Sequence, residues 1–385
     1  MVNRRTLLRN SALTGALGLV STTGRAVTAR PTYAGPNVVI VRFGGGVRRR
    51  ETIDAQHTYS PYLLKSLSRR GTLFTNMEVS NLEGVTQTSH AQGTLYLLTG
   101  RYDAYEDVES QFLGERFEPA APTLFEYLRK SYDVADYQCL IVNGEDRKNE
   151  EYFTFSNHDL YGVDYRCHTL SLARYKRYLF EQQIAEGGLD AKQLEKTRKQ
   201  LADLENLDYR NAEPLGQGAR LEAFWARWRE YFGDSGFVNA RGDGLLTQLS
   251  LWALEHLQPR LMMINYQDPD YVHWGNPSHY TRGIAEIDRG LQQLVSAIDA
   301  LPRYRDQTLI VVVPDCGRDS NPFMRVPFQH HFNSRSAHEI WALLVGPGVA
   351  KGRVYDHQVN QIDVTKTIGA LMGIPTPSAE GGVLV

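Results

Sequence analysis

Three polar side chains follow a short apolar run in the second half of the chain. Residues 261–264 (LMMI) are short enough for a buried strand, and Asp268, Asp270 and His273 come soon after them. In open α/β sheets, ligands bind beyond the carboxyl ends of the strands. Carboxylates and a neutral imidazole offer lone pairs to a divalent metal. The pattern predicts a metal site, with a loop whose aspartates cap the next helix as the alternative.

A second aspartate has the same placement. Residues 308–313 (TLIVVV) predict a buried strand, and Asp315 and Cys316 follow it. A thiolate is a good zinc ligand, whereas a protonated cysteine is among the most often buried residue types. Cys316 is therefore either a metal ligand or a small residue that fills the core. Further along, His330 and His331 add two imidazoles.

Hydroxyl groups gather before a short predicted helix that ends near residue 100. Thr86, Thr88 and Ser89 precede His90 in this segment. A Thr or Ser at a helix N-terminus is usually a cap. The same position favours an attacking group, because the free N–H groups and the helix dipole stabilise negative charge. A hydroxyl also needs a base or a metal to attack well. All four residues are candidate catalytic residues.

Glycines end the first predicted strand, residues 37–41 (NVVIV), whose β-branched run is typical of a central parallel strand covered on both faces. Gly44 and Gly45 follow, and glycine lets the backbone approach another group closely. Nearby Arg48, and Arg318 after the 308–313 strand, could hold an anion. We treat these four residues as candidate substrate contacts, with a flexible turn and solvated arginines as the alternative.

The elements that would position these groups alternate between strands and helices. Further strands are predicted at residues 136–142 and 341–345, and helices at 122–130, 245–257, from 278 onward and at 361–373. This order predicts an α/β fold with a doubly wound, mostly parallel sheet between helices. The alternation is lost over residues 143–241. We interpret that stretch as a helical insertion that forms a cap or the arm of a homodimer.

Composition and the N-terminus limit the classes of function. The net charge of -2 over 385 residues argues against a nucleic-acid binder driven by bulk electrostatics. Residues 1–29 contain Arg4 and Arg5 before a short apolar run and a small-residue cleavage site, which predicts a twin-arginine signal and a periplasmic or secreted protein. The apolar run is too short for a stable membrane anchor.

Taken together, the motifs resemble the alkaline phosphatase superfamily. They are NVVIV at the first strand, LLTGRY after the hydroxyl cluster, DPDYVH, VVVPDCG, the two adjacent histidines before a strand, and GPG followed by IDVTKTIGALMGIP. The resemblance implies a doubly wound α/β domain over residues 30–385. It also implies a bimetal site at the strand ends and cleavage of phosphate or sulfate esters through a Thr, Ser or formylglycine. The formylglycine motif Cys-x-Pro-Ser-Arg is absent from the sequence.

Residue by residue, the resemblance implies one nearly complete metal site and one altered site. Asp270, His273 and either His330 or His331 match the first. In the second, Gly44 stands where the family has an aspartate, and the family's Asp-His is Asp315-Cys316. The attacking group is matched in two ways. Its spacing from His90 selects Thr86, whereas counting back from Thr99-Gly100 reaches His90 itself.

Two hypotheses follow. The first is an exported hydrolase of small anionic phosphate or related esters, which uses a Thr or Ser nucleophile and one or two divalent ions. Zinc is the first choice of metal, with manganese and calcium as alternatives. The second is a degenerate member of the superfamily that binds an anionic ligand or a partner without catalysis. The metal content of the purified protein is the first test: about two ions per chain support catalysis, none supports the second hypothesis, and a single ion fits both.

Overall fold

The computed structural model describes residues 29–80, 86–102, 119–145, 150–205, 218–233, 242–320, 329–330 and 334–385. Nearly all of the predicted signal, as well as His331, lies outside these ranges.

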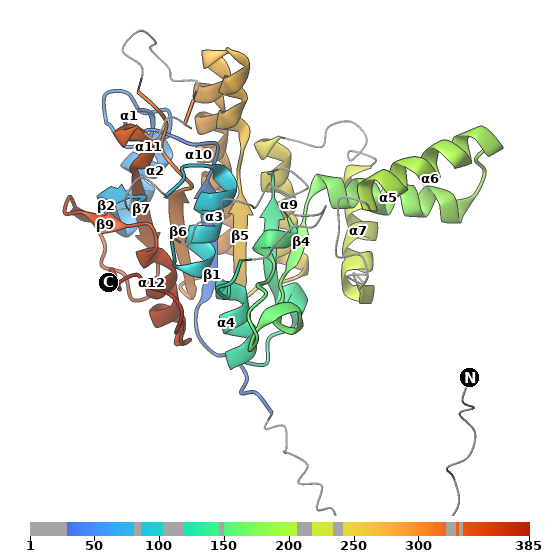
Figure 1. Cartoon of the computed structure of the whole chain (residues 1–385), viewed down its shortest axis with the longest axis horizontal. Helices are drawn as coiled ribbons and strands as arrows, with labels where there is room; N and C mark the ends of the chain where they lie inside the picture. The colour runs from blue at the N-terminus through green and yellow to red at the C-terminus, as the bar shows by residue number, and fades with distance from the viewer. Residues whose placement is uncertain are drawn as a thin grey trace, which may run out of the picture.

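One mixed sheet forms the centre of the molecule (Figure 1). Its strands are β1 (Asn37–Phe43), β2 (Thr72–Glu78), β3 (Cys139–Asn143), β4 (His168–Leu170), β5 (Leu261–Asn265), β6 (Thr308–Pro314), β7 (Glu339–Val345), β8 (Arg353–Tyr355) and β9 (Val359–Asn360). The spatial order is β4-β3-β5-β1-β6-β7-β2-β8, and β9 also pairs with β2. Strands β4, β3, β5, β1 and β6 run parallel to one another, and β7 is antiparallel to β6 and β2. The predicted doubly wound, mostly parallel α/β fold is confirmed.

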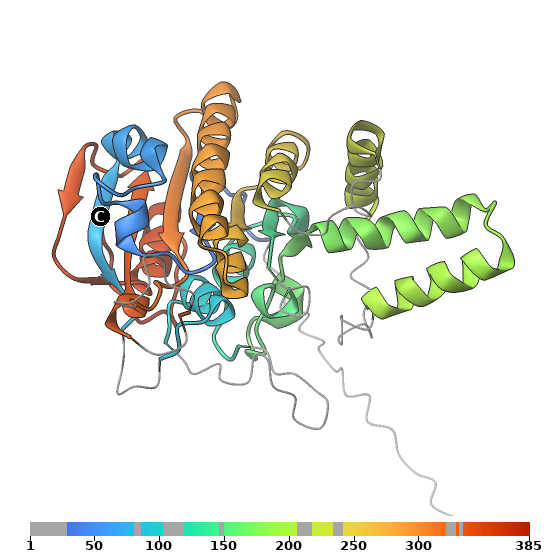
Figure 2. The same cartoon turned by 90° about the horizontal axis from the view of Figure 1, so that it is seen from above.

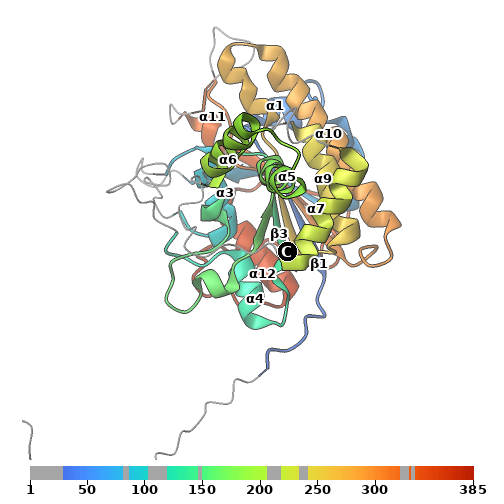
Figure 3. The ribbon, with the colours of Figure 1, turned by 90° about the vertical axis from the view of Figure 1, so that its right-hand side faces the viewer.

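Helices cover both faces of the sheet (Figure 3). The α-helices of the described residues are α1 (Arg49–Thr52), α2 (Pro61–Lys65), α3 (His90–Thr99), α4 (Leu124–Ser131), α5 (Leu172–Glu186), α6 (Ala191–Glu205), α7 (Gly218–Phe232), α9 (Asp243–His256), α10 (Pro277–Ala300), α11 (Arg335–His338) and α12 (Asp363–Met372), and not all of them lie on the sheet.

The side chains of β1 alternate between two cores. Val39 and Val41 share a core with residues of α9 and α10, whereas Val38 and Ile40 share one with residues of α3, α4 and α12. This alternation is the period of two that any strand has. Burial on both faces explains why the strand lacks polar alternation. Arg42 is fully buried although it lies in this strand, on the same face as Val38 and Ile40.

The carboxyl ends of the parallel strands meet at one edge of the sheet. Phe43 pairs with Pro314, and Asn143 pairs with Asn265. Helix α3 also begins at this edge, since its first residue, His90, lies beside Asp315. Ser89 caps the helix by accepting a hydrogen bond from the Gln92 N–H. Later in α3, Gly93 packs so closely that a Cβ there would lie 2.2 Å from the Asp315 carbonyl oxygen.

Part of the predicted insertion belongs to the main domain. Strand β4, which the sequence did not predict, extends the sheet by pairing in parallel with β3. Tyr175, Trp225 and Trp228 of α5 and α7 join the same core as α9 and α10. Helices α5 and α6 form a hairpin that projects from the body (Figure 2). Its role in a homodimer stays a prediction.

Candidate metal centre

Four ligand atoms converge beyond the carboxyl edge of the sheet. They are Nε2 of His90, His273 and His330 and Oδ1 of Asp270, and all lie within 4.8 Å of one another. The carboxylate oxygen is 3.0 Å from His90, 2.9 Å from His273 and 3.6 Å from His330. The structure thus brings together the predicted group of Asp270, His273 and His330, and adds His90, which the sequence had suggested as a catalytic residue.

The opposite ring nitrogens of two of these histidines are held in place. His90 Nδ1 lies 2.6 Å from Asp315 Oδ2, and His330 Nδ1 lies 2.7 Å from the Thr88 carbonyl oxygen. Carboxylates and carbonyls only accept, so each Nδ1 carries the proton and, in the neutral ring, Nε2 presents a lone pair. Outer carboxylates and carbonyls fix metal-binding histidines in the same way.

The donor set fits a divalent metal. His90 Nε2 is buried without a well-aligned hydrogen bond, although Asp270 Oδ1 is only 3.0 Å away. Two lone pairs that face each other need a proton or a cation between them. Burial disfavours the charged ring, but the charges of Asp270 and Asp315 outweigh it and raise the pKa of His90 well above its ordinary value. Three imidazoles and one carboxylate are ligands that zinc accepts.

Arg318 anchors Asp270. Its Nη2 donates to Asp270 Oδ1 at 2.7 Å and to the Gly45 carbonyl oxygen at 2.5 Å, and its Nε donates to the Gly46 carbonyl oxygen at 2.8 Å. Burial opposes ionisation of Asp270, but the charge of His90 and hydrogen bonds from His273 and other groups hold its pKa well below the usual range. Arg318 was expected to contact substrate, and in the structure it is fully buried behind the cluster's carboxylate.

Asp315 and Cys316 lie beside His90, and ligand atoms of the three are within 4.8 Å of one another. Burial, followed by the charge of Asp315, raises the pKa of the Cys316 thiol to about 11. A metal ion that bound Cys316 would have to displace this proton.

The glycines form a tightly packed turn. A Cβ on Gly44 would lie 1.7 Å from the Tyr266 carbonyl oxygen, and one on Gly45 would lie 2.6 Å from the Asp270 nitrogen. Gly45 also has a φ of +79°, which favours glycine. Arg48 pairs with Glu51 at 2.5 Å. Gly44 and Gly45, which were expected to contact substrate, therefore pack against backbone atoms of the protein. Arg48, expected to do the same, pairs with a carboxylate of the protein.

The hydroxyl cluster is largely engaged in structure. Ser89 is the cap of α3, and the Thr88 hydroxyl donates to the His330 carbonyl oxygen at 2.6 Å. Thr86 is buried. His90 is the first residue of α3.

Sequence reasoning missed Arg42 and Glu145. Arg42 Nη1 lies 3.3 Å from Glu145 Oε2 and 3.4 Å from Asp315 Oδ2, and all three side chains are buried. The available signal was a charged residue inside an apolar strand. A buried charge requires a partner, so Arg42 pointed to a nearby carboxylate.

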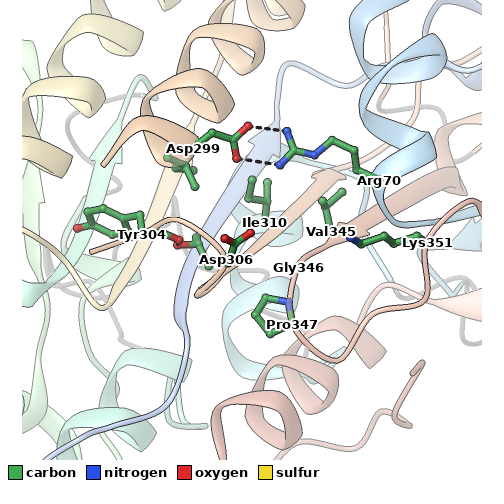
Figure 4. Close-up of a pocket in the computed structure, with 11 residues that line it drawn as sticks. Arg70, Asp299, Tyr304, Asp306, Ile310, Val345, Gly346, Pro347 and Lys351 are labelled. Atoms are coloured by element: carbon green, nitrogen blue, oxygen red, sulfur yellow. Dashed lines mark hydrogen bonds and ion pairs between the residues drawn. The ribbon is translucent and has the colours of Figure 1, made fainter. Parts of the chain in front are cut away.

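A separate pocket of about 260 Å³ lies away from the centre (Figure 4). It is lined by Thr308 at the start of β6 and Val345 at the end of β7, so it lies at the edge opposite Asp315. Two of its charged residues, Arg70 and Asp299, pair with each other at 2.7 Å, and Asp306 and Lys351 also line it. None of the residues that line this pocket belongs to the metal centre.

A partly buried, histidine-rich cluster at the carboxyl edge of a doubly wound sheet defines an α/β protein with a candidate metal centre. No family model and no curated protein matches the chain, but solved structures do. A member of the alkaline phosphatase superfamily from Vibrio parahaemolyticus is 15% identical, with a TM-score of 0.55, and the match covers 92% of this chain and 70% of that one.

Two further structures are similar. The lipoteichoic acid synthase LtaP from Listeria monocytogenes is 12% identical, with a TM-score of 0.53 and coverage of 91% and 74% of the two chains. The phosphonate monoester hydrolase SpPMH from Silicibacter pomeroyi is 15% identical, with a TM-score of 0.51 and coverage of 91% and 76%. The chain therefore has the alkaline phosphatase-like fold that the sequence motifs predicted.

Proposed function

We propose that the protein is an exported, metal-dependent hydrolase of phosphate or related esters. The observation that carries this proposal is the convergence of three imidazoles on Asp270 Oδ1 at the carboxyl edge of the sheet. This edge is where α/β proteins place their active sites. A phosphonate monoester hydrolase is among the proteins of similar fold, which supports the same class of reaction.

The residues of the chain prepare the site for an anionic ester. A divalent ion held by His90, Asp270, His273 and His330 would polarise an ester oxygen and offset the charge that develops on it. Asp315 keeps the Nδ1 proton of His90 in place, and Arg318 fixes Asp270. Because these supporting contacts are buried, they hold the ligands ready before substrate arrives.

The attacking group is assigned to the hydroxyls before α3. Thr88 uses its hydroxyl to hold the loop of His330, and Ser89 caps the helix. Thr86 is therefore the hydroxyl to test first. Its position near the start of α3 would place an attacking oxygen where the helix dipole favours negative charge.

The test is to measure metal content and hydrolysis on the same purified protein. Elemental analysis should find bound divalent metal, zinc first. The protein should hydrolyse at least one of p-nitrophenyl phosphate, bis(p-nitrophenyl) phosphate, p-nitrophenyl phenylphosphonate and p-nitrophenyl sulfate. Activity should disappear with a chelator and return with metal. Protein that takes up no metal after dialysis against Zn²⁺, Mn²⁺ or Ca²⁺ would contradict the proposal.

The structural use of Thr88 and Ser89 favours one competing function, a protein that binds an anionic ester without cleaving it. In that case the metal would be present, but no ester would be hydrolysed. Binding of inorganic phosphate or sulfate, measured by calorimetry, would remain. The same preparation therefore distinguishes the two functions.

We also expect export by the twin-arginine route. Changing both Arg4 and Arg5 to Lys removes the recognition pair but keeps the charge, so the protein should accumulate in the cytoplasm of a bacterial host. Fractionation with antibody detection measures this. Unchanged periplasmic yield would contradict it.

Within the part of the chain that the structure describes, none of the helices is both long and apolar enough to cross a membrane.

A further inference from the structure

We propose that the guanidinium group of Arg42 takes the place of a second metal ion, so that the centre binds one ion rather than two. This inference rests on the proposed function, because it concerns the same site. It follows from the contacts of Arg42, from the acceptor atoms of Asp315 and from the space around Gly44.

Arg42 is built into the position between the strand ends. Its side chain is fully buried, although burying an isolated charge is very unfavourable. Both terminal nitrogens of its planar group meet acceptors: Nη1 lies near Thr94 Oγ1 at 2.7 Å, the His90 carbonyl oxygen at 3.3 Å, Glu145 Oε2 at 3.3 Å and Asp315 Oδ2 at 3.4 Å, and Nη2 lies near the Tyr266 carbonyl oxygen at 2.8 Å and Gln267 Oε1 at 3.1 Å. The group is thus a fixed part of the site.

Asp315 has no oxygen left for an ion. Its Oδ1 accepts from the Gly46 N–H at 3.1 Å and from the Cys316 N–H at 2.8 Å. Its Oδ2 receives His90 Nδ1 at 2.6 Å and lies 3.4 Å from Arg42. A carboxylate offers about four lone-pair positions. All four face donors from the protein, so a metal would first have to displace one of them.

One other ligand expected for a second ion, an aspartate at position 44, is missing. Gly44 stands where the resemblance placed an aspartate, and no side chain fits there because a Cβ would meet the Tyr266 carbonyl oxygen at 1.7 Å and Arg42 Nη2 at 2.7 Å. Cys316 is a buried thiol.

Replacement of an ion by an arginine has a chemical consequence. The guanidinium carries one positive charge, cannot lose it at physiological pH and cannot be removed by a chelator. Asp315 therefore has a cationic neighbour whether or not metal is bound. The positive charge of Arg42 is therefore always present, whereas the positive charge beside Asp270 depends on the supply of metal.

The first experiment counts ions. Wild-type protein is dialysed to equilibrium against Zn²⁺, and in parallel against Mn²⁺, and analysed for metal per chain. One equivalent is expected, and anomalous diffraction should place it beside Asp270. Two equivalents, with one ion beside Asp315, would overturn this inference but leave the proposed hydrolase intact. No bound metal would instead overturn the proposed function.

The second experiment tests the charge of Arg42 by urea unfolding. Arg42→Met leaves two buried carboxylates with less compensation, so its midpoint should fall by about 1 M or more. Arg42→Met combined with Glu145→Gln removes one charge of each sign and should recover a large part of that fall. The matched control is Arg70→Met, an arginine whose ion pair is exposed, and its midpoint should barely move.

Two outcomes would contradict the role of Arg42. One is an unchanged midpoint in Arg42→Met. The other is a double variant whose loss of midpoint equals the loss in Arg42→Met plus the loss in Glu145→Gln alone. Additive losses would mean that the two charges do not interact. If Arg42→Met does not fold at all, the double variant still decides the question, since it should fold and bind one equivalent of Zn²⁺.

Discussion

Asp270→Ala is expected to remove the metal from the protein and with it the hydrolytic activity. Asp270 Oδ1 is the atom on which His90, His273 and His330 converge. Loss of an outer partner of a metal ligand costs about 10- to 100-fold in affinity, so loss of the central ligand should cost more than about 100-fold. The variant also leaves Arg318 without its carboxylate partner. Elemental analysis after dialysis against Zn²⁺, together with the ester assays, measures both effects.

Asp268→Asn is the matched control for this change. Asp268 lies two residues earlier on the same 3₁₀ helix, Asp268–Trp274, but its Oδ2 accepts from the backbone N–H of Asp243, at the start of α9. An asparagine keeps an acceptor there, so metal content should stay at the wild-type level. Full metal in Asp270→Ala, or equal losses in both variants, would show that the cluster is not the binding site.

Gly44→Ala is expected to destabilise the fold more than any other single methyl addition at the site. The new Cβ would lie 1.7 Å from the Tyr266 carbonyl oxygen, and that obstacle is backbone in the loop after β5 rather than a side chain that can rotate. Overpacking of a core commonly costs about 1–3 kcal/mol, and a clash with backbone should reach or exceed about 3 kcal/mol. Urea unfolding at neutral pH measures the loss.

Gly382→Ala is the control for that variant. Its Cβ would have only Asp363 Oδ1 nearby, at 3.8 Å, so the unfolding midpoint should change little. The comparison also bears on the aspartate that the superfamily has at Gly44. Gly44→Asp should unfold the protein rather than restore a ligand. Wild-type stability in either Gly44 variant would show that the loop after β5 can move away.

The sequence predicted the fold well because the decisive strands are buried on both faces. Residues 261–264 and 308–313 are continuous apolar runs, and they form the centres of β5 and β6. The prediction failed where tertiary context decides the structure. Strand β2 carries Thr75 and Asn76 in an irregularity of its pairing with β7, which interrupts the apolar pattern. Strand β4 has only three residues, too few for a periodic signal.

The candidate site was only partly predictable, for a physical reason. Asp270 and His273 lie on one short segment, so their spacing in the sequence reveals them. The place of His90 between Asp270 and Asp315 depends on how closely α3 packs on the sheet edge, and no local pattern records that. Arg42 was hidden because its partner Glu145 is brought close only by the order of the strands.

The hydrogen bonds between Thr88 and His330 join residues that are 242 positions apart in the chain. A metal ion shared by His90 and His330 would add a cross-link between the same two distant segments. Cross-linking restricts the unfolded chain, and the entropy that it removes rises with the length of the closed loop. Metal binding would therefore act as a reversible cross-link. A protein that carries its ion would resist unfolding and proteolysis better than the same protein stripped of it.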